Sequence, residues 1–277
     1  MIDLHTHTTE SDGRCAPGEL VALAVAADVT VLAVTDHDTV EGCGAAAGAC
    51  AAAGITFVTG IEVTAVHADH DVHVLGYFID VAAPRLHTFL SEQRLSRLDR
   101  LRQMMAKLAT LGIELDAEAI LRPALDNPRK AAGRPWIARA LVDGGHVAST
   151  DEAFERWLVR GRPAFVPRLG ASPAEVIARI HDAKGVASLA HPALVGHDEW
   201  IHSMVSDGLD ALEAYHSQHD PEATSRYLAM ASTMGLGVSG GSDFHGDPSH
   251  GPSRPGAVSL PRDAYEELVR RKQRRSG

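Results

Sequence analysis

The first residues of the chain include side chains of the kind that bind divalent metals. A short apolar run beginning at Ile2 ends in His5 and His7, and Asp12 follows shortly after in a Ser-Asp-Gly sequence. If residues 2–5 form a strand, His5 and His7 lie on the same face, because strand side chains alternate with a period of two. Two imidazoles beside a carboxylate suit zinc, manganese or iron. The opening motif therefore predicts part of a metal site.

Further histidines and carboxylates stand at or near the ends of predicted strands along the rest of the chain. They are His37, Glu62, His73, His191, His216, Asp243 and His245. The carboxyl ends of parallel strands meet at one face of a barrel, and that is where barrel enzymes place their chemistry. One buried histidine alone is more often structural, but a series at the same end of successive strands indicates a site. Surface or packing roles are expected for His67, His70, His87, His146, His181, His197, His202 and His250.

The apolar segments predict the elements that would position these residues. Strands are expected at 2–5, 31–35, 56–60, 72–78, 186–190, 211–215 and 236–239, with helices at 20–27 and 43–53. This alternation predicts a parallel sheet covered by helices. It stops between about 84 and 163, where apolar residues at helical spacing predict a long helix over 86–111 and shorter helices at 117–121, 136–143 and 151–159. We therefore predict an α/β barrel formed by 1–83 and 164–277, with 84–163 as a helical insertion subdomain.

The composition limits the classes of partner. A net charge of −10 over 277 residues argues against an extended DNA-binding surface, but bound cations would still allow a small anionic substrate. The three cysteines lack metal-finger spacing, so we expect reduced thiols. The chain starts on a strand without a basic-then-apolar leader, and no apolar run is long enough to span a bilayer. We therefore expect a cytoplasmic protein that does not bind membranes, of undetermined oligomeric state.

The motifs resemble those of the PHP (polymerase and histidinol phosphatase) superfamily. D-L-H-x-H-T with a following S-D-G, T-D-H-D-T, G-I-E, H-x-L-G-Y, A-H-P and G-S-D-F-H occur in that order between Ile2 and His245. The helical insertion is similar to that of stand-alone 3′,5′-nucleotide bisphosphate phosphatases, some of which also trim RNA from the 5′ end. The resemblance implies a distorted seven-stranded (β/α) barrel whose trinuclear site holds two or three divalent ions of manganese, iron or zinc.

Carried over to this sequence, the resemblance implies three metal positions. The first would take His5, His7, Glu62 and Asp243, the second Glu62, His73 and His191, and the third Asp12, His37 and His245. The residues of the third position are also the candidates for catalysis, and either Asp12 or His245 would protonate the leaving alkoxide.

The resemblance also implies substrate contacts made by the insertion. Arg97 and Arg100 lie one helical turn apart, and they would face the metals together with Arg134 and hold a second phosphate. His219 is a further candidate substrate contact. For Arg94 and Arg102, a solvated basic helix face is an equally good interpretation.

These features predict a metal-dependent phosphoesterase in which a metal-bound hydroxide attacks a phosphomonoester. The expected substrate is a small nucleotide such as a 3′,5′-bisphosphate, or a short RNA. The alternatives are a histidinol-phosphate phosphatase, a cyclic-phosphate phosphodiesterase, a short-RNA 5′ exonuclease or, in a different class, a non-catalytic metal-binding PHP module. The exact substrate stays open, because Leu194 stands where relatives have a phosphate-binding arginine after the His-Pro motif.

Overall fold

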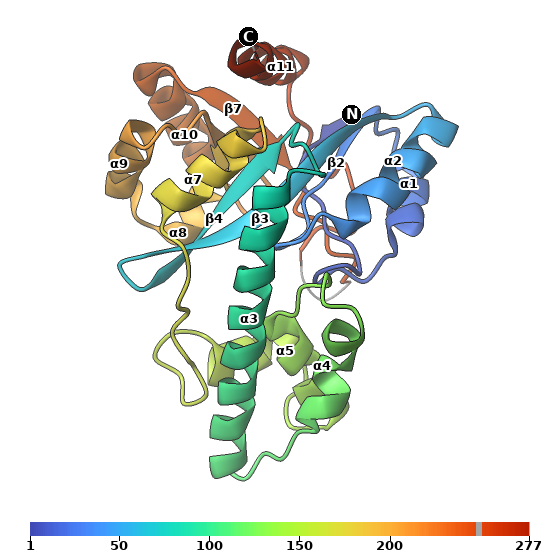
Figure 1. Ribbon diagram of the computed structural model, residues 1–277, viewed down its shortest axis with the longest axis vertical. Helices are drawn as coiled ribbons and strands as arrows, with labels where there is room; N and C mark the ends of the chain where they lie inside the picture. The colour runs from blue at the N-terminus through green and yellow to red at the C-terminus, as the bar shows by residue number, and fades with distance from the viewer. Residues whose placement is uncertain (248–250, 277) are drawn as a thin grey trace.

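A computed structural model of the protein describes residues 1–247 and 251–276, so the expectation for His250 lies outside the described residues. Across the described part, seven strands form one sheet in the order β1 to β7 (Figure 1). The strands are β1 (Ile2–Asp3), β2 (Val31–Val34), β3 (Thr56–His67), β4 (His70–Tyr77), β5 (Val186–Leu189), β6 (Ala211–His216) and β7 (Gly237–Gly241).

The sheet is nearly closed into a barrel. The amide of Leu4 donates to the carbonyl of Gly240 at 3.2 Å, and Thr6 forms a parallel bridge with Phe244 just beyond β7. The amide of Asp243 donates to His5 O at 2.8 Å, which brings the residues after β1 and β7 together. The predicted seven-stranded α/β barrel is confirmed.

The prediction of an entirely parallel sheet was wrong. β4 runs antiparallel to both β3 and β5, while the other neighbouring pairs are parallel. β3 extends to His67, well past the predicted end, and a two-residue turn joins it to His70. Both turn residues, Ala68 and Asp69, have positive φ, as type I′ hairpin turns require. A crossover between parallel strands needs a dozen or more residues, whereas two residues join β3 to β4. Such a short connection permits only an antiparallel hairpin.

Helices cover the outside of the barrel. α1 (Pro17–Ala26) and α2 (Glu41–Ala53) follow the first two strands, and α2 ends at Gly54, whose φ of 72° lies in the left-handed region that helix ends favour. The helices of the second half of the barrel are α7 (Pro173–Asp182), α8 (Pro192–Val195), the 3₁₀ turn η2 (Asp198–Trp200), α9 (Ile201–Ser206), α10 (Pro221–Met234) and α11 (Arg262–Ser276). No helix in the described residues combines the length and apolarity needed to cross a bilayer.

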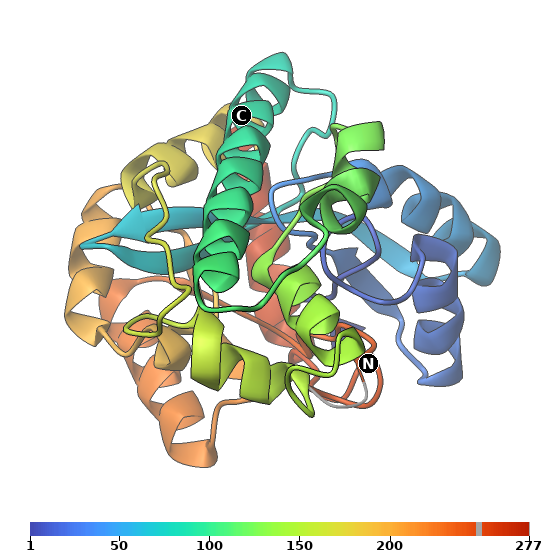
Figure 2. The same ribbon diagram turned by 90° about the horizontal axis from the view of Figure 1, so that it is seen from below.

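The segment between β4 and β5 is helical, as predicted. It contains α3 (Pro84–Thr110), α4 (Ala117–Asp126), α5 (Arg134–Asp143), α6 (Thr150–Ala153) and the π-helical turn η1 (Phe154–Leu158). Leu101, Met105 and Leu108 of α3 are buried against Ile137 and Leu141 of α5, so the insertion has a hydrophobic core of its own. Figures 1 and 2 show these helices lying across one end of the barrel.

Candidate active site

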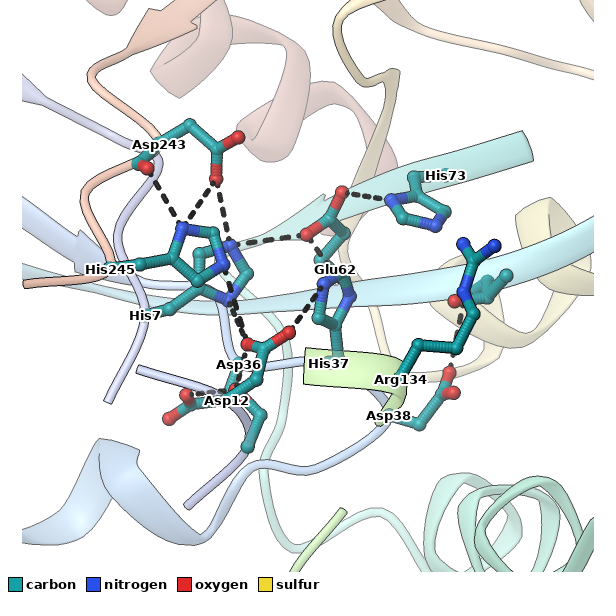
Figure 3. Close-up of polar contacts among 12 residues, drawn as sticks. His7, Asp12, Asp36, His37, Asp38, Glu62, His73, Arg134, Asp243 and His245 are labelled. Carbon is teal, nitrogen blue, oxygen red and sulfur yellow. Dashed lines mark hydrogen bonds and ion pairs between the residues drawn. The ribbon is translucent and has the colours of Figure 1, made fainter. Parts of the chain in front are cut away.

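Glu62 of β3 lies at the centre of the histidine cluster and is 1% exposed (Figure 3). Its Oε2 atom lies 3.3 Å from His5 Nε2, 3.2 Å from His7 Nε2 and 3.2 Å from His37 Nδ1, and its Oε1 atom lies 2.7 Å from His73 Nδ1 and 3.0 Å from His191 Nε2. One buried carboxylate therefore contacts imidazoles contributed by β4 and by the segments that follow β1, β2 and β5.

The structure brings all nine predicted metal ligands together. Within the described residues, their donor atoms form four overlapping groups, each within 4.8 Å: His7, Asp12, His37 and His245; His5, His216 and Asp243; His5, Glu62 and His191; and His37, Glu62 and His73. Among the residues that the structure describes, the one addition to these groups is His216, which the sequence placed at a strand end but not in the ligand set. Its Nε2 atom lies 3.3 Å from Asp243 Oδ2.

Three residues at this face have backbone conformations that residues other than glycine rarely adopt. Asp38, His191 and Asp243 have φ values of 50°, 26° and 56°. Such conformations cost free energy and cluster at functional sites, where the surrounding structure holds them in place. Each lies within four residues after a strand end, and its side chain contacts the cluster or an arginine beside it.

The cluster holds three carboxylates, of which Asp12 and Glu62 are buried and Asp243 is partly exposed. Among the described residues, Asp12, Glu62 and Asp243 form ion pairs with histidines alone. Burial favours their neutral forms, but the surrounding imidazoles outweigh burial and hold the pKa of all three well below its ordinary value. These carboxylates are therefore ionised at neutral pH and need positive charge close by.

Two observations indicate that these residues fit a divalent-metal site: buried imidazole nitrogens without a hydrogen bond in the described structure, and the chemical types of the converging side chains. His7 Nε2 lies 3.2 Å from Glu62 Oε2 and 3.1 Å from Asp243 Oδ1, but neither this atom nor the buried His37 Nδ1 forms a hydrogen bond within the part of the chain that the structure describes. Imidazole nitrogens that converge with ionised carboxylates are the ligands that zinc, manganese and iron prefer. Burial lowers the pKa of His37 to about 3, so this imidazole is neutral, as a ligand must be. In the metal-free protein, Asp243 and Glu62 overcome burial and raise the pKa of His7 to about 10.

Buried carboxylates that the sequence analysis missed hold the cluster in position. Glu213, inside β6, accepts a hydrogen bond from His5 Nδ1 at 2.8 Å and another from the backbone amide of His191 at 2.7 Å. Such a contact fixes the ring so that His5 Nε2 faces the cluster. Asp3 accepts from the amide and hydroxyl of Ser242, at 2.9 and 2.6 Å, and so joins β1 to the segment before Asp243. The available signal was a single acidic residue within an otherwise apolar strand.

A cavity of about 140 Å³ opens beside the cluster. Asp12, His37 and His73 line one side, and arginines from the insertion and the segment after it line the other: Arg97, Arg100, Arg134 and Arg168. Leu101, Pro135 and Phe154 add apolar wall. The three arginines predicted from sequence thus lie at one cavity with three of the candidate ligands, and Arg168 is an addition that no sequence motif indicated.

Two aspartates hold the arginines in place. Asp38 pairs with Arg97 and with Arg168, the latter at 2.8 Å. Asp71 pairs with Arg100 at 3.2 Å and Arg134 at 3.3 Å. Against the effect of burial, these arginines lower the pKa of Asp71 to about 2. The cavity thus has two more guanidinium charges than carboxylates to pair with them on this wall.

The other residues considered as substrate contacts in the sequence do not line this cavity. His219 Nδ1 donates to Ala214 O at 3.0 Å, its ring packs between His216 and Tyr227, and it does not line the cavity. Leu194, on α8, is 52% exposed and does not line the cavity either. Arg94 is buried and donates to the carbonyls of Pro128 and Asp38, whereas Arg102 is an exposed partner of Asp99.

Known proteins show clear similarity to this chain. The PHP domain family model matches residues 3–131. A 3′,5′-nucleoside bisphosphate phosphatase of Chromobacterium violaceum is 36% identical over 249 residues, which cover 88% of this chain and 87% of that protein. The 5′-3′ exoribonuclease Rnm of Salmonella typhimurium is 34% identical over 252 residues, or 88% and 85% of the two chains. A crystal structure from Bifidobacterium adolescentis, of a protein proposed to be a metal-dependent phosphoesterase, has a TM-score of 0.88 at 32% identity and covers 97% of this chain and 95% of its own.

Proposed function

Because this chain belongs to the PHP family and is a phosphoesterase of that family, we propose that it removes phosphate from a small nucleotide bearing two phosphates, such as a nucleoside 3′,5′-bisphosphate. The observation that carries this proposal is the cavity that has candidate metal ligands on one side and Arg97, Arg100, Arg134 and Arg168 on the other. One phosphate would lie at the metals while the arginines hold the other.

The charges of the cavity wall support a second anionic group. Four arginines face two aspartates there, so two positive charges remain for a ligand. Guanidinium groups bind phosphate through paired, charge-assisted hydrogen bonds. Because each arginine is already held by an aspartate, little side-chain entropy remains to be lost on binding.

We assign the metals to the nine residues expected from the sequence. His5, His7, Glu62 and Asp243 would hold the first ion, Glu62, His73 and His191 the second, and Asp12, His37 and His245 the third. His216 is a further candidate beside Asp243. Two or three divalent ions bound there would supply an activated water and positive charge for the phosphoryl oxygens.

The chain itself would orient the substrate and exclude water. Asp12 and His37 line the cavity, and His245 Nε2 lies 3.4 Å from Asp12 Oδ1, so these three residues are the candidates to act on the reacting phosphate and to hold the proton for the leaving oxygen. Leu101 and Phe154 line the cavity and would shield the bound substrate from water. Removal of water strengthens the charge interactions of the arginines.

A second candidate function is exonuclease cleavage of short RNA from the 5′ end. The Salmonella typhimurium exoribonuclease is nearly as similar to this chain as the bisphosphatase is. In both reactions one phosphate would lie at the metals and a neighbouring phosphate at the arginines, so the same cavity would serve either substrate.

A substrate panel tests the proposal. Phosphate or nucleotide release is measured with added Mn²⁺ on a nucleoside 3′,5′-bisphosphate, its 5′- and 3′-monophosphates, histidinol phosphate, a cyclic phosphate and a 5′-phosphorylated oligoribonucleotide. The bisphosphate should give the highest kcat/KM. Preference for the oligoribonucleotide would establish the exonuclease instead. A metal-loaded protein that hydrolyses none of them would be a non-catalytic module.

A further inference from the structure

The loop that carries Asp12 is anchored to the barrel by another carboxylate. Asp36 accepts hydrogen bonds from the amide and hydroxyl of Thr8, at 2.7 and 2.6 Å, and from the hydroxyl of Ser11 at 2.7 Å. The amide of Gly13 then turns back onto Thr8 O at 2.9 Å. A Cβ atom at Gly13 would lie 2.6 Å from His7 O, so this close turn requires glycine.

The helical insertion holds the same loop from the other side. The amide of Ala131 donates to Glu10 O at 3.0 Å, Trp136 Nε1 donates to Ser11 O at 3.1 Å, and the guanidinium of Arg139 donates to Asp12 O. Three consecutive carbonyls therefore have partners in the insertion. Trp136 and Arg139 both lie on α5, the helix that begins with the cavity residue Arg134.

These contacts matter more for the position of Asp12 than for the positions of His37 and His245, the other two candidate ligands of the same ion. His37 forms a backbone bridge with Glu62, and Phe244, next to His245, forms one with Thr6, so the sheet itself positions both histidines. Asp12 lies in a loop outside any strand. Its carboxylate accepts only a 3.2 Å hydrogen bond from the neighbouring Ser11 hydroxyl among the described residues, apart from the histidines it faces. The direction of that carboxylate therefore depends on how its backbone is held.

We propose that Trp136 and Arg139 are positioning residues that fix the Asp12 carboxylate for the metal position formed by Asp12, His37 and His245. The insertion thus does more than contact substrate: through two backbone carbonyls it controls whether this ion binds. The inference rests on the metal assignment of the proposed function, but it is independent of which phosphoester is hydrolysed. Outer contacts of this kind commonly change metal affinity by about 10- to 100-fold.

Manganese binding to the full-length chain tests this proposal without substrate. The protein is stripped with a chelator and titrated with Mn²⁺, with free Mn²⁺ followed by electron paramagnetic resonance and bound metal measured after desalting. Trp136→Phe keeps the ring and removes the N–H donor. Trp157→Phe is the matched control, because Trp157 Nε1 is buried in the same subdomain without a hydrogen-bond partner in the described structure. Arg139→Gln is paired with Arg102→Gln, which removes an exposed arginine.

Trp136→Phe and Arg139→Gln should weaken one manganese position by roughly 10- to 100-fold and leave the remaining positions unchanged. Arg139→Lys should restore part of that affinity, while Trp157→Phe and Arg102→Gln should match the wild type. In an Asp12→Asn background, Trp136→Phe should have no further effect, because both changes act on the same ion.

Three results would overturn the proposal. Wild-type manganese affinity in Trp136→Phe and Arg139→Gln would show that Asp12 needs no support from α5. An equal loss in Trp157→Phe would assign the effect to general destabilisation of the insertion. Unchanged manganese content in Asp12→Asn would show that Asp12 holds no ion. If instead the metal results are as expected but no phosphoester is hydrolysed, the positioning role stands and the proposed function fails.

Discussion

Arg134→Gln separates binding of a second phosphate from the chemistry at the metals. Arg134 lines the cavity and shares Asp71 with Arg100, which lies 3.2 Å from that carboxylate and should remain its partner when Arg134 is replaced. No aspartate is therefore left without an arginine, and the loss measured is that of the substrate contact. Removing a charged hydrogen bond costs about 1.5–3 kcal/mol. This corresponds to a loss of about 10- to 150-fold in kcat/KM for a 3′,5′-bisphosphate.

The assay compares kcat/KM for a nucleoside 3′,5′-bisphosphate and for the 5′-monophosphate of the same nucleoside, with saturating Mn²⁺. The monophosphate should lose little in Arg134→Gln, because it has no group for the arginine wall. Arg97→Ala and Arg100→Ala should give the same selectivity, since Asp38 keeps Arg168 and Asp71 keeps Arg134. Arg102→Gln is the surface control. Equal losses on both substrates would show that these arginines support the structure, and the reasoning would be refuted.

Three further predictions concern the metals, the substrate and the stability of the fold. Glu62→Gln keeps the shape of a side chain that contacts five imidazoles but removes its charge, so bound manganese and activity should fall together; full activity with unchanged metal content would contradict the trinuclear assignment. Leu194 is exposed on α8 and does not line the cavity, so Leu194→Arg should leave kcat/KM nearly unchanged for both the bisphosphate and a monophosphate; a selective gain for the bisphosphate would show that this position faces the second phosphate. Burial opposes ionisation of Asp210, but hydrogen bonds from His181, Arg275 and the amide of Ala187 outweigh it and lower its pKa. Asp210→Asn should therefore reduce the free energy of unfolding at pH 7 by about 1–3 kcal/mol, and this difference should shrink as the pH falls below about 4; a difference in urea unfolding that does not change with pH would contradict it.

The sequence by itself determined most of the candidate metal cluster. Most of the candidate ligands stand at or near the ends of short apolar strands, and the ends of parallel strands that alternate with helices meet at one face. The strand pattern does not say which ligands share an ion, and the grouping of His5, His7, Glu62 and Asp243 followed from the resemblance to the PHP superfamily. The long helix α3 was predictable for a similar reason, because Leu101, Met105 and Leu108 repeat at the helical period and are buried together.

Tertiary structure alone decided what surrounds that cluster. β4 is antiparallel because β3 continues to His67 and leaves only a two-residue turn, which depends on pairing along the whole hairpin. Arg168 joins the cavity, Glu213 orients His5, and Trp136 holds Ser11 O, in each case through contacts between residues far apart in the chain. A local pattern reports the period and polarity of one segment, whereas the partner of a buried charge or a loop carbonyl is set by whichever distant segment the fold packs against it. For that reason the candidate ligands could be predicted from the sequence, and the groups that position them could not.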